Sequence, residues 1–137
     1  MERSKSSIQK TKAEHPGIAE YFNFKNPALI KQIEEEYPET TTEYLNIVVE
    51  SYETFCLKQS NYGPSNISVG TNVRSAEDIK LSLSGLFFRL YDKISRIKQL
   101  VVLGKQDNVG EAVDDTLQDL GVYAIIAQIV KRGKWGK

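Results

Sequence analysis

Three acidic residues in the last quarter of the chain recur at a spacing that suits metal or cation binding. Glu111, Asp115 and Asp119 are four residues apart, so at ~100° of rotation per residue they follow one side of a helix. The same side continues into apolar residues, and carboxylates beside an apolar stripe are costly unless a cation or a donor meets them. We therefore expect these acids to face a partner inside the fold.

The preceding segment offers basic partners at matching intervals. Arg89, Lys93 and Arg96 fall on one side of a helix, separate from its apolar side, and Asp92 lies among them. Guanidinium and ammonium groups bind phosphate oxygens, whereas carboxylates are the ligands that Mg²⁺ prefers. The two sets together predict a solvent-reachable pocket with acids on one wall and bases on the other. Such a pocket suits a phosphate ligand bridged by a divalent metal.

Two other interpretations of these acids remain open. Asn108 stands three residues before Glu111, so Glu111 could complete a capping box at the start of its helix rather than bind a ligand. Asp115 and Asp119 could instead form an internal salt-bridge network with the basic residues of the other helix. Under that interpretation the polar residues are part of the architecture and carry no chemistry.

A family resemblance rests on these same segments. The motifs are Arg89-Leu90-Tyr91-Asp92-Lys93-Ile94-Ser95-Arg96, then Glu111, Asp115-Thr116-Leu117, Asp119-Leu120 and Tyr123-Ala124, with Tyr62-Gly63 upstream. Over roughly residues 43 to 127 the chain resembles the phage and bacterial family called nucleotide modification associated domain 1. More distantly, that family is similar to the MazG-like all-α nucleoside triphosphate pyrophosphohydrolases, which hold Mg²⁺ on helix-borne acids.

The resemblance implies a nucleotide ligand and a set of site residues. Arg89, Lys93, Arg96, Tyr62 and Tyr123 would bind the ligand and its phosphates. The metal ligands for Mg²⁺ would be Asp92, Glu111, Asp115 and Asp119.

The chain departs from this pattern at several positions. Asn61 stands before Tyr62-Gly63, where the family usually has an acidic residue. Asp114 stands where Glu is common in the family. The MazG-like enzymes also carry a Glu-x-x-Glu pair on an earlier helix. The matching pair here, Glu50 and Glu53, projects away from the predicted apolar face and is expected in solvent.

Composition excludes several classes of protein. The chain has 137 residues with 18 basic and 18 acidic side chains, and this zero net charge argues against general nucleic-acid binding. No segment has the ~20 apolar residues of a membrane span. The single cysteine, Cys56, excludes an internal disulfide, and we expect it to be buried on a helix. We expect a cytoplasmic protein, in the host cytoplasm if the chain is phage-encoded.

Periodicity predicts an all-α fold, a helical bundle of about four main helices with a flexible N-terminal tail. Residues 1–14 would be the tail and residues 15–137 a single α-helical domain. The helices are expected near residues 27–37, 41–61, 76–103 and 109–132. Because the last of them is apolar on two sides, we expect a homo-oligomer with this helix near the interface.

Three functions fit the sequence. The first is nucleotide binding with Mg²⁺-dependent pyrophosphohydrolase activity, in which metal-assisted water would attack a phosphoanhydride. The second is a non-catalytic binder that sequesters a nucleotide or a nucleotide-derived signal. The third is a structural homo-oligomeric helical protein. Whether the chain is an enzyme stays open at this point.

Overall fold

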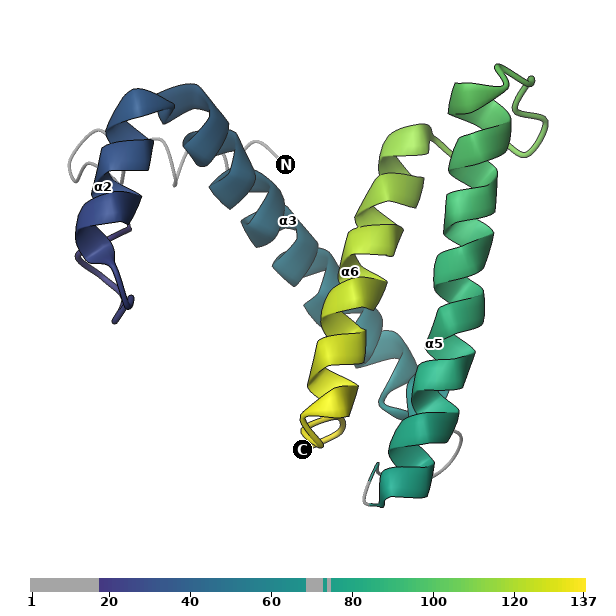
Figure 1. The fold of residues 1–137 in the computed structure, drawn as a ribbon. Coiled ribbons are helices and arrows are strands. Elements are labelled where there is room, and N and C mark those ends of the chain that lie inside the picture. The colour runs from purple at the N-terminus through teal and green to yellow at the C-terminus, as the bar shows by residue number, and fades with distance from the viewer. Residues whose placement is uncertain (1–17, 69–72, 74) are drawn as a thin grey trace. The chain divides into compact units, whose positions relative to one another are not determined.

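The computed structural model describes residues 18–68, 73 and 75–137 and confirms the all-α prediction (Figure 1). Its elements are α2 (Pro27–Glu36), α3 (Pro38–Tyr62), the short α4 (Ser65–Ser68), α5 (Ala76–Ile97), the π-helical turn η1 (Lys98–Val102) and α6 (Val113–Lys131). No strand occurs among the described residues, and none of their helices is long and apolar enough to cross a membrane. The predicted tail, residues 1–14, lies outside the described part of the chain.

The chain divides into two compact units, Met1–Thr54 and Phe55–Lys137. We describe each unit by itself, and the predicted single domain over residues 15–137 stays a prediction. The first unit contains α2 and most of α3. The second unit contains the end of α3 and all later elements, including every candidate ligand-binding and metal-binding residue predicted from the sequence.

Capping residues set several of the helix ends where the sequence predicted them. The Asn26 side chain accepts a hydrogen bond from the Leu29 amide at 3.1 Å and starts α2 just before Pro27. Ser75 and Asp78 form a reciprocal capping box at the start of α5. Gly63, with φ of 64°, follows the last residue of α3.

Two predicted helix starts were wrong. Helix α3 begins at Pro38, so Thr40 lies inside its first turn; proline is well suited to the first helical position. Helix α6 begins at Val113 with Ala112 as its N-cap residue, and no side chain caps it. Asp107 instead accepts from the amides of Val109 and Gly110 in the preceding turn. Glu111 therefore precedes the helix, and its predicted capping role is wrong.

In the first unit, several predictions of burial are corrected. Glu34 belongs to a run of three glutamates, a pattern that predicts an exposed face, but it is buried and accepts a hydrogen bond from the Ile18 amide at 2.9 Å. Glu35 and Glu36 are exposed as expected. The predicted apolar face of α3 is open, since Tyr44 and Tyr52 are 70% and 69% exposed.

Two further predictions about α3 are corrected. Cys56, which was expected to be buried, is exposed. Glu50 is half-buried rather than solvated, whereas Glu53 is exposed as predicted.

The core of the second unit is small and is completed by the C-terminal tryptophan. Among the described residues of this unit, the buried apolar side chains are Ile67, Val73, Leu86, Ile126, Val130 and Trp135. Trp135 Nε1–H donates to the Pro64 carbonyl at 3.0 Å, and its ring meets Phe55 edge-on at 6.2 Å between centroids. The residue ties the C-terminus to the end of α3 and to α4.

Helices α5 and α6 lie side by side and antiparallel in this unit (Figure 1). The predicted core face of α5 is wrong in part: Leu86 is buried, but Phe87, Ile94 and Val101 are more than half exposed. The buried side of α5 instead includes Ser82 and continues along the basic residues. Sequence periodicity favoured the apolar side, whereas ion pairs with α6 favour the basic side.

Replacing Trp135 tests whether the C-terminus completes the core. Trp135→Ala should lower the free energy of unfolding by about 3–5 kcal/mol, because it removes a fully buried ring. Trp135→Phe should cost less, about 1–2 kcal/mol, because it keeps an aromatic ring and loses the hydrogen bond to Pro64. Urea unfolding followed by circular dichroism measures both. Equal stability of Trp135→Ala and the parent would contradict this account of the core.

Candidate functional site

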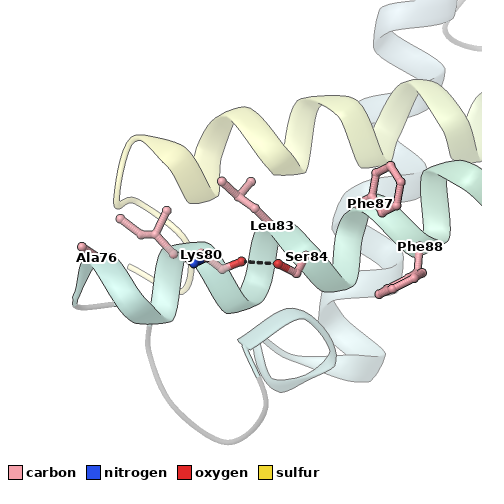
Figure 2. Close-up of a pocket in the computed structure, with 7 residues that line it drawn as sticks. Ala76, Lys80, Leu83, Ser84, Phe87 and Phe88 are labelled. Carbon is pink, nitrogen blue, oxygen red and sulfur yellow. Dashed lines mark hydrogen bonds between the residues drawn. The ribbon is translucent and has the colours of Figure 1, made fainter.

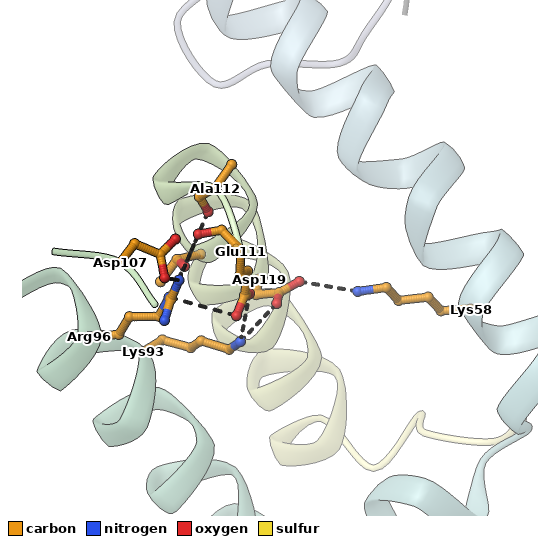
Figure 3. A network of polar contacts seen from close by, with 8 residues as sticks. Lys58, Lys93, Arg96, Asp107, Glu111, Ala112 and Asp119 are labelled. Carbon is orange, nitrogen blue, oxygen red and sulfur yellow. Dashed lines mark hydrogen bonds and ion pairs between the residues drawn. The ribbon is translucent and has the colours of Figure 1, made fainter. Parts of the chain in front are cut away.

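The ammonium group of Lys93 lies between two carboxylates and joins α5 to α6 and to the turn before α6. Its Nζ is 3.0 Å from Asp119 Oδ2 and 3.3 Å from Glu111 Oε1. The other oxygen of Asp119, Oδ1, is 3.1 Å from Lys58 Nζ at the end of α3 (Figure 3). Asp119 and Lys93 are each only about a fifth exposed, at 19% and 21%. The interaction is therefore stronger than a surface ion pair.

Arg96 fixes the connection between the two helices from the same side of α5. Its Nη2 donates to the Glu111 carbonyl at 2.6 Å and lies 3.3 Å from Asp107 Oδ1. Its Nε donates to Thr116 Oγ1 at 3.1 Å, and Thr116 is fully buried. One guanidinium thus holds the turn before α6 and the first turn of α6 itself (Figure 3).

These contacts shift the pKa values of the charged groups. Partial burial pushes the pKa of Asp119 upward, but hydrogen bonds and charges from Lys93 and Lys58 outweigh it and lower the pKa. Burial likewise opposes the charged form of Lys93, but Asp119 and Glu111 outweigh it and raise the pKa. For Asp107, the hydrogen bond from the Val109 amide is the main cause of a lowered pKa, with Arg96 contributing. All three groups are held in their charged forms.

The structure brings together part of the predicted site. Lys93, Arg96, Glu111 and Asp119 meet, and the prediction that acids and bases face each other across α5 and α6 agrees with their placement. Asp92 and Asp115 are exposed and lie outside this network. The expected alignment at residues 111, 115 and 119 fails because α6 begins only at Val113, and Thr116 rather than Asp115 faces Arg96.

The carboxylates do not fit a protein-held Mg²⁺ site in this arrangement. Within residues 18–68, 73 and 75–137, no three aspartate, glutamate, histidine or cysteine side chains gather as metal ligands. Asp119 uses both oxygens on lysines, and Lys93 stands between Asp119 and Glu111, where a cation would be expected. The acids are thus neutralised by the chain's own bases.

A pocket of about 390 Å³ opens beside this network in the second unit. It is lined by Phe55, Lys58, Gln59, Tyr62, Asn66, Arg89, Asp119, Val122, Tyr123 and Ile126. Arg89 Nη2 donates to the Asn66 carbonyl at 2.6 Å, and its guanidinium lies 5.6 Å from the centre of the Tyr123 ring. The pocket therefore combines cationic groups with aromatic rings.

The pocket contains four predicted site residues, Tyr62, Arg89, Asp119 and Tyr123. Asn66 belongs to the 65–74 segment, whose polar side chains could contact a base or phosphate or could simply connect two helices. The polar residues Lys58 and Gln59 were not indicated by the sequence. Lys58, Gln59 and Tyr62 share a side of α3 at helical spacing, which is a signal the sequence contained. Asn66 could not be placed in this way, because it lies on the short helix α4 after the break at Gly63.

A depression of about 520 Å³ runs along α5, and its lining has few groups that could bind or react with a ligand (Figure 2). Its described lining residues are Ala76, Ile79, Lys80, Leu83, Ser84, Phe87 and Phe88, and among them Lys80 alone is charged. The Ser84 hydroxyl donates to the Lys80 carbonyl at 2.8 Å and is engaged within the helix. We therefore place the candidate site in the pocket beside Arg89.

Asp119→Asn tests the strength of the ion-pair network. The change should lower the free energy of unfolding at pH 7 by about 1–3 kcal/mol, since the partly buried Lys93 and the exposed Lys58 lose their shared carboxylate. Because the folded-state pKa of Asp119 is lowered, the pair stabilises the fold above the unfolded pKa of about 3.9. That stability is lost as pH falls through the folded pKa. The difference in the free energy of unfolding between parent and variant should therefore become smaller below about pH 4.

Asp115→Asn is the matched control, because Asp115 is exposed on the same helix and outside the network. It should change stability by less than about 0.5 kcal/mol. Urea titrations of all three proteins at pH 7 and at pH 3 measure both effects. Equal costs for the two variants would show that the network does not stabilise the fold.

Comparison with known families agrees with the location of this site. Residues 58–130 match the family described as nucleotide modification associated domain 1. This range begins at Lys58 and includes the ion-pair network and all of the pocket residues except Phe55. No curated protein and no solved structure matches the chain. The matched range covers more than half of the 137 residues, and the chain belongs to the nucleotide modification associated domain 1 family.

Proposed function

We propose that this protein binds a nucleotide in the pocket lined by Arg89, Lys58, Tyr62 and Tyr123. The observation that carries the proposal is the combination, in one pocket, of two cationic side chains with tyrosine rings and two amide side chains. Cationic side chains bind phosphates, whereas tyrosine rings and amide side chains bind bases. The family's description, nucleotide modification associated domain 1, supports the same ligand class.

The base would lie against the aromatic part of the pocket. Tyr62 and Tyr123 offer ring faces, and stacking on a tyrosine is tolerant of base identity. The amides of Gln59 and Asn66 can both donate and accept hydrogen bonds, as the edges of all bases require. Because Arg89 is bonded to the Asn66 carbonyl, the backbone at Asn66 is fixed before ligand arrives.

The phosphates would bind to Arg89 and Lys58. The Arg89 fork has five N–H donors, and its hydrogen bond to the Asn66 carbonyl uses one of them. Lys58 is 53% exposed and pairs with Asp119, which also pairs with Lys93. Moving Lys58 from Asp119 to a phosphate would therefore leave Asp119 neutralised, and an exposed pair of this kind costs ~1 kcal/mol or less to break.

We propose binding rather than hydrolysis as the activity. Glu111 and Asp119 are held by Lys93 and do not fit a protein-held metal, so no step is assigned to a metal-bound water. Mg²⁺ stays a prediction for the complex, in which the nucleotide's own phosphates would carry it. Sequestration of a nucleotide or of a nucleotide-derived signal is thus favoured over a pyrophosphohydrolase. The expected MazG-like relationship and phage origin also stay predictions.

A thermal-shift screen with nucleoside mono-, di- and triphosphates tests this proposal. A ligand present at 100 times its dissociation constant should stabilise the protein by about 2.7 kcal/mol. Arg89→Ala and Tyr123→Ala should each remove most of the shift, because they delete the phosphate and base contacts respectively. The stabilisation should persist in EDTA, and no pyrophosphate should be released from triphosphates.

Arg132→Ala is the matched control for Arg89→Ala, since Arg132 is an exposed arginine outside the pocket. It should leave the nucleotide shift unchanged. A panel without any stabilising nucleotide would refute nucleotide binding. Stoichiometric pyrophosphate release with Mg²⁺, abolished by Asp119→Asn, would instead support the hydrolase.

The predicted homo-oligomer is also retained as a proposal, and the outer side of α6 supports it. Leu117 and Ile125 are 50% and 51% exposed, and the exposed residues Gly121 and Ala124 lie between them. These four residues follow helical spacing and form one apolar strip, which is the kind of surface that self-association covers.

Light scattering at micromolar concentration should give a dimer or a higher oligomer. The Ile125→Lys variant should be a monomer, because an ammonium group would have to be buried in the interface. Val109→Lys is the control, as Val109 is 80% exposed and outside the strip. A monomeric parent protein would contradict this part of the proposal.

A further inference from the structure

A second pocket, which is not the depression of Figure 2, adjoins the candidate site beside Arg89 and shares part of its wall. We call the candidate site the first pocket. It has a volume of about 350 Å³ and is lined by Asn66, Ile67, Leu81, Ser82, Ser84, Gly85, Leu86, Phe88 and Arg89. Asn66 and Arg89 line both pockets. The two hollows therefore meet at one hydrogen-bonded pair, in which Arg89 Nη2 donates to the Asn66 carbonyl at 2.6 Å.

The shared pair carries the groups that a bridging ligand would contact. Arg89 brings a permanent positive charge and a planar set of donors to the boundary. Asn66 Oδ1 is buried, and no described residue gives it a hydrogen-bond partner. Buried polar atoms in native proteins are rarely left unpaired, so this side-chain amide is a candidate for a ligand contact.

The second pocket differs from the first in its chemistry. Among its described lining residues Arg89 is the one charged side chain, and most of the others are aliphatic or aromatic or are small. The Phe88 ring is 66% exposed and Leu81 is 67% exposed, so both present open apolar surface. A Cβ added at Gly85 would meet nothing within 4 Å, which leaves room above the helix. These features suit a second flat ring rather than a second phosphate.

We infer that the ligand is a dinucleotide, with its linking phosphate on Arg89 and one base in each pocket. The inference rests on the proposed nucleotide-binding function and names the class of nucleotide. The first base lies with Tyr62 and Tyr123, and the second lies against Phe88. A mononucleotide fills the first pocket only and leaves the apolar wall of the second in water.

Phe87 and Phe88 supply a matched pair of variants. They are adjacent and similarly exposed, at 58% and 66%, but Phe88 lines the second pocket and Phe87 does not. Figure 2 shows their rings leaving α5 on different sides. Because both are largely in solvent, truncation of either ring should leave the fold intact.

The experiment compares ApA, GpG, CpC and UpU with AMP, GMP, CMP and UMP by isothermal titration calorimetry in EDTA. Each dinucleoside monophosphate has one phosphate and less negative charge than its mononucleotide, so tighter binding must come from the second nucleoside. We expect the best dinucleotide to bind at least about tenfold tighter than its mononucleotide. Phe88→Ala should remove this gain without changing mononucleotide binding, and Phe87→Ala should preserve it.

The outcomes separate this inference from the proposed function. Equal affinity for the two ligand classes, or a gain that survives Phe88→Ala, overturns the dinucleotide and leaves nucleotide binding standing. If neither class binds, the dinucleotide inference is overturned, and the proposed function is overturned as well when the thermal-shift screen also finds no stabilising di- or triphosphate.

Discussion

The bridge from Lys93 to Asp119 and Glu111 is the interaction on which the second unit depends. It joins the C-terminal part of α5 to α6 and to the turn that precedes α6, and Arg96 reinforces it one turn along. Few apolar side chains of this unit are fully buried. The pairing of the two helices therefore relies more on charges than is usual for a small all-α fold. Because each carboxylate has its own cations, these charges are compensated inside the protein.

This compensation determines which groups are available to a ligand. Lys93 and Arg96 are committed to the network, whereas Arg89 lies one turn before Lys93, at the edge of the pocket. Lys58 is shared, since its partner Asp119 already has a second lysine. The basic residues on one side of α5 thus have two roles: Lys93 and Arg96 hold α6 and the turn before it, and Arg89 is available to the proposed ligand. The spacing of the residues is regular, but their surroundings differ.

The sequence predicted the helices better than it predicted the site. Caps and breaks such as Asn26, the Ser75–Asp78 pair and Gly63 are local signals, so α2, α5 and the end of α3 fall where expected. The start of α6 depended on Arg96, which holds the Glu111 carbonyl from another helix, and that long-range contact was not visible in the sequence. The salt-bridge alternative foresaw the pairing of Asp119 with Lys93 but not the exposed Asp115, and Lys58 reaches the pocket only through tertiary packing.

The account's central claim, that a nucleotide binds between Tyr62 and Tyr123, is tested most directly by labelling the tyrosine rings with carbon-13. Spectra would be recorded during a titration with AMP, GMP, CMP and UMP in EDTA. Tyr62 and Tyr123 line the pocket, whereas Tyr44 and Tyr52 are exposed on α3 in the other unit and act as internal references. We predict saturable shifts of the Tyr62 and Tyr123 resonances alone with at least one nucleotide. Unmoved resonances of both residues with every nucleotide would contradict the claim.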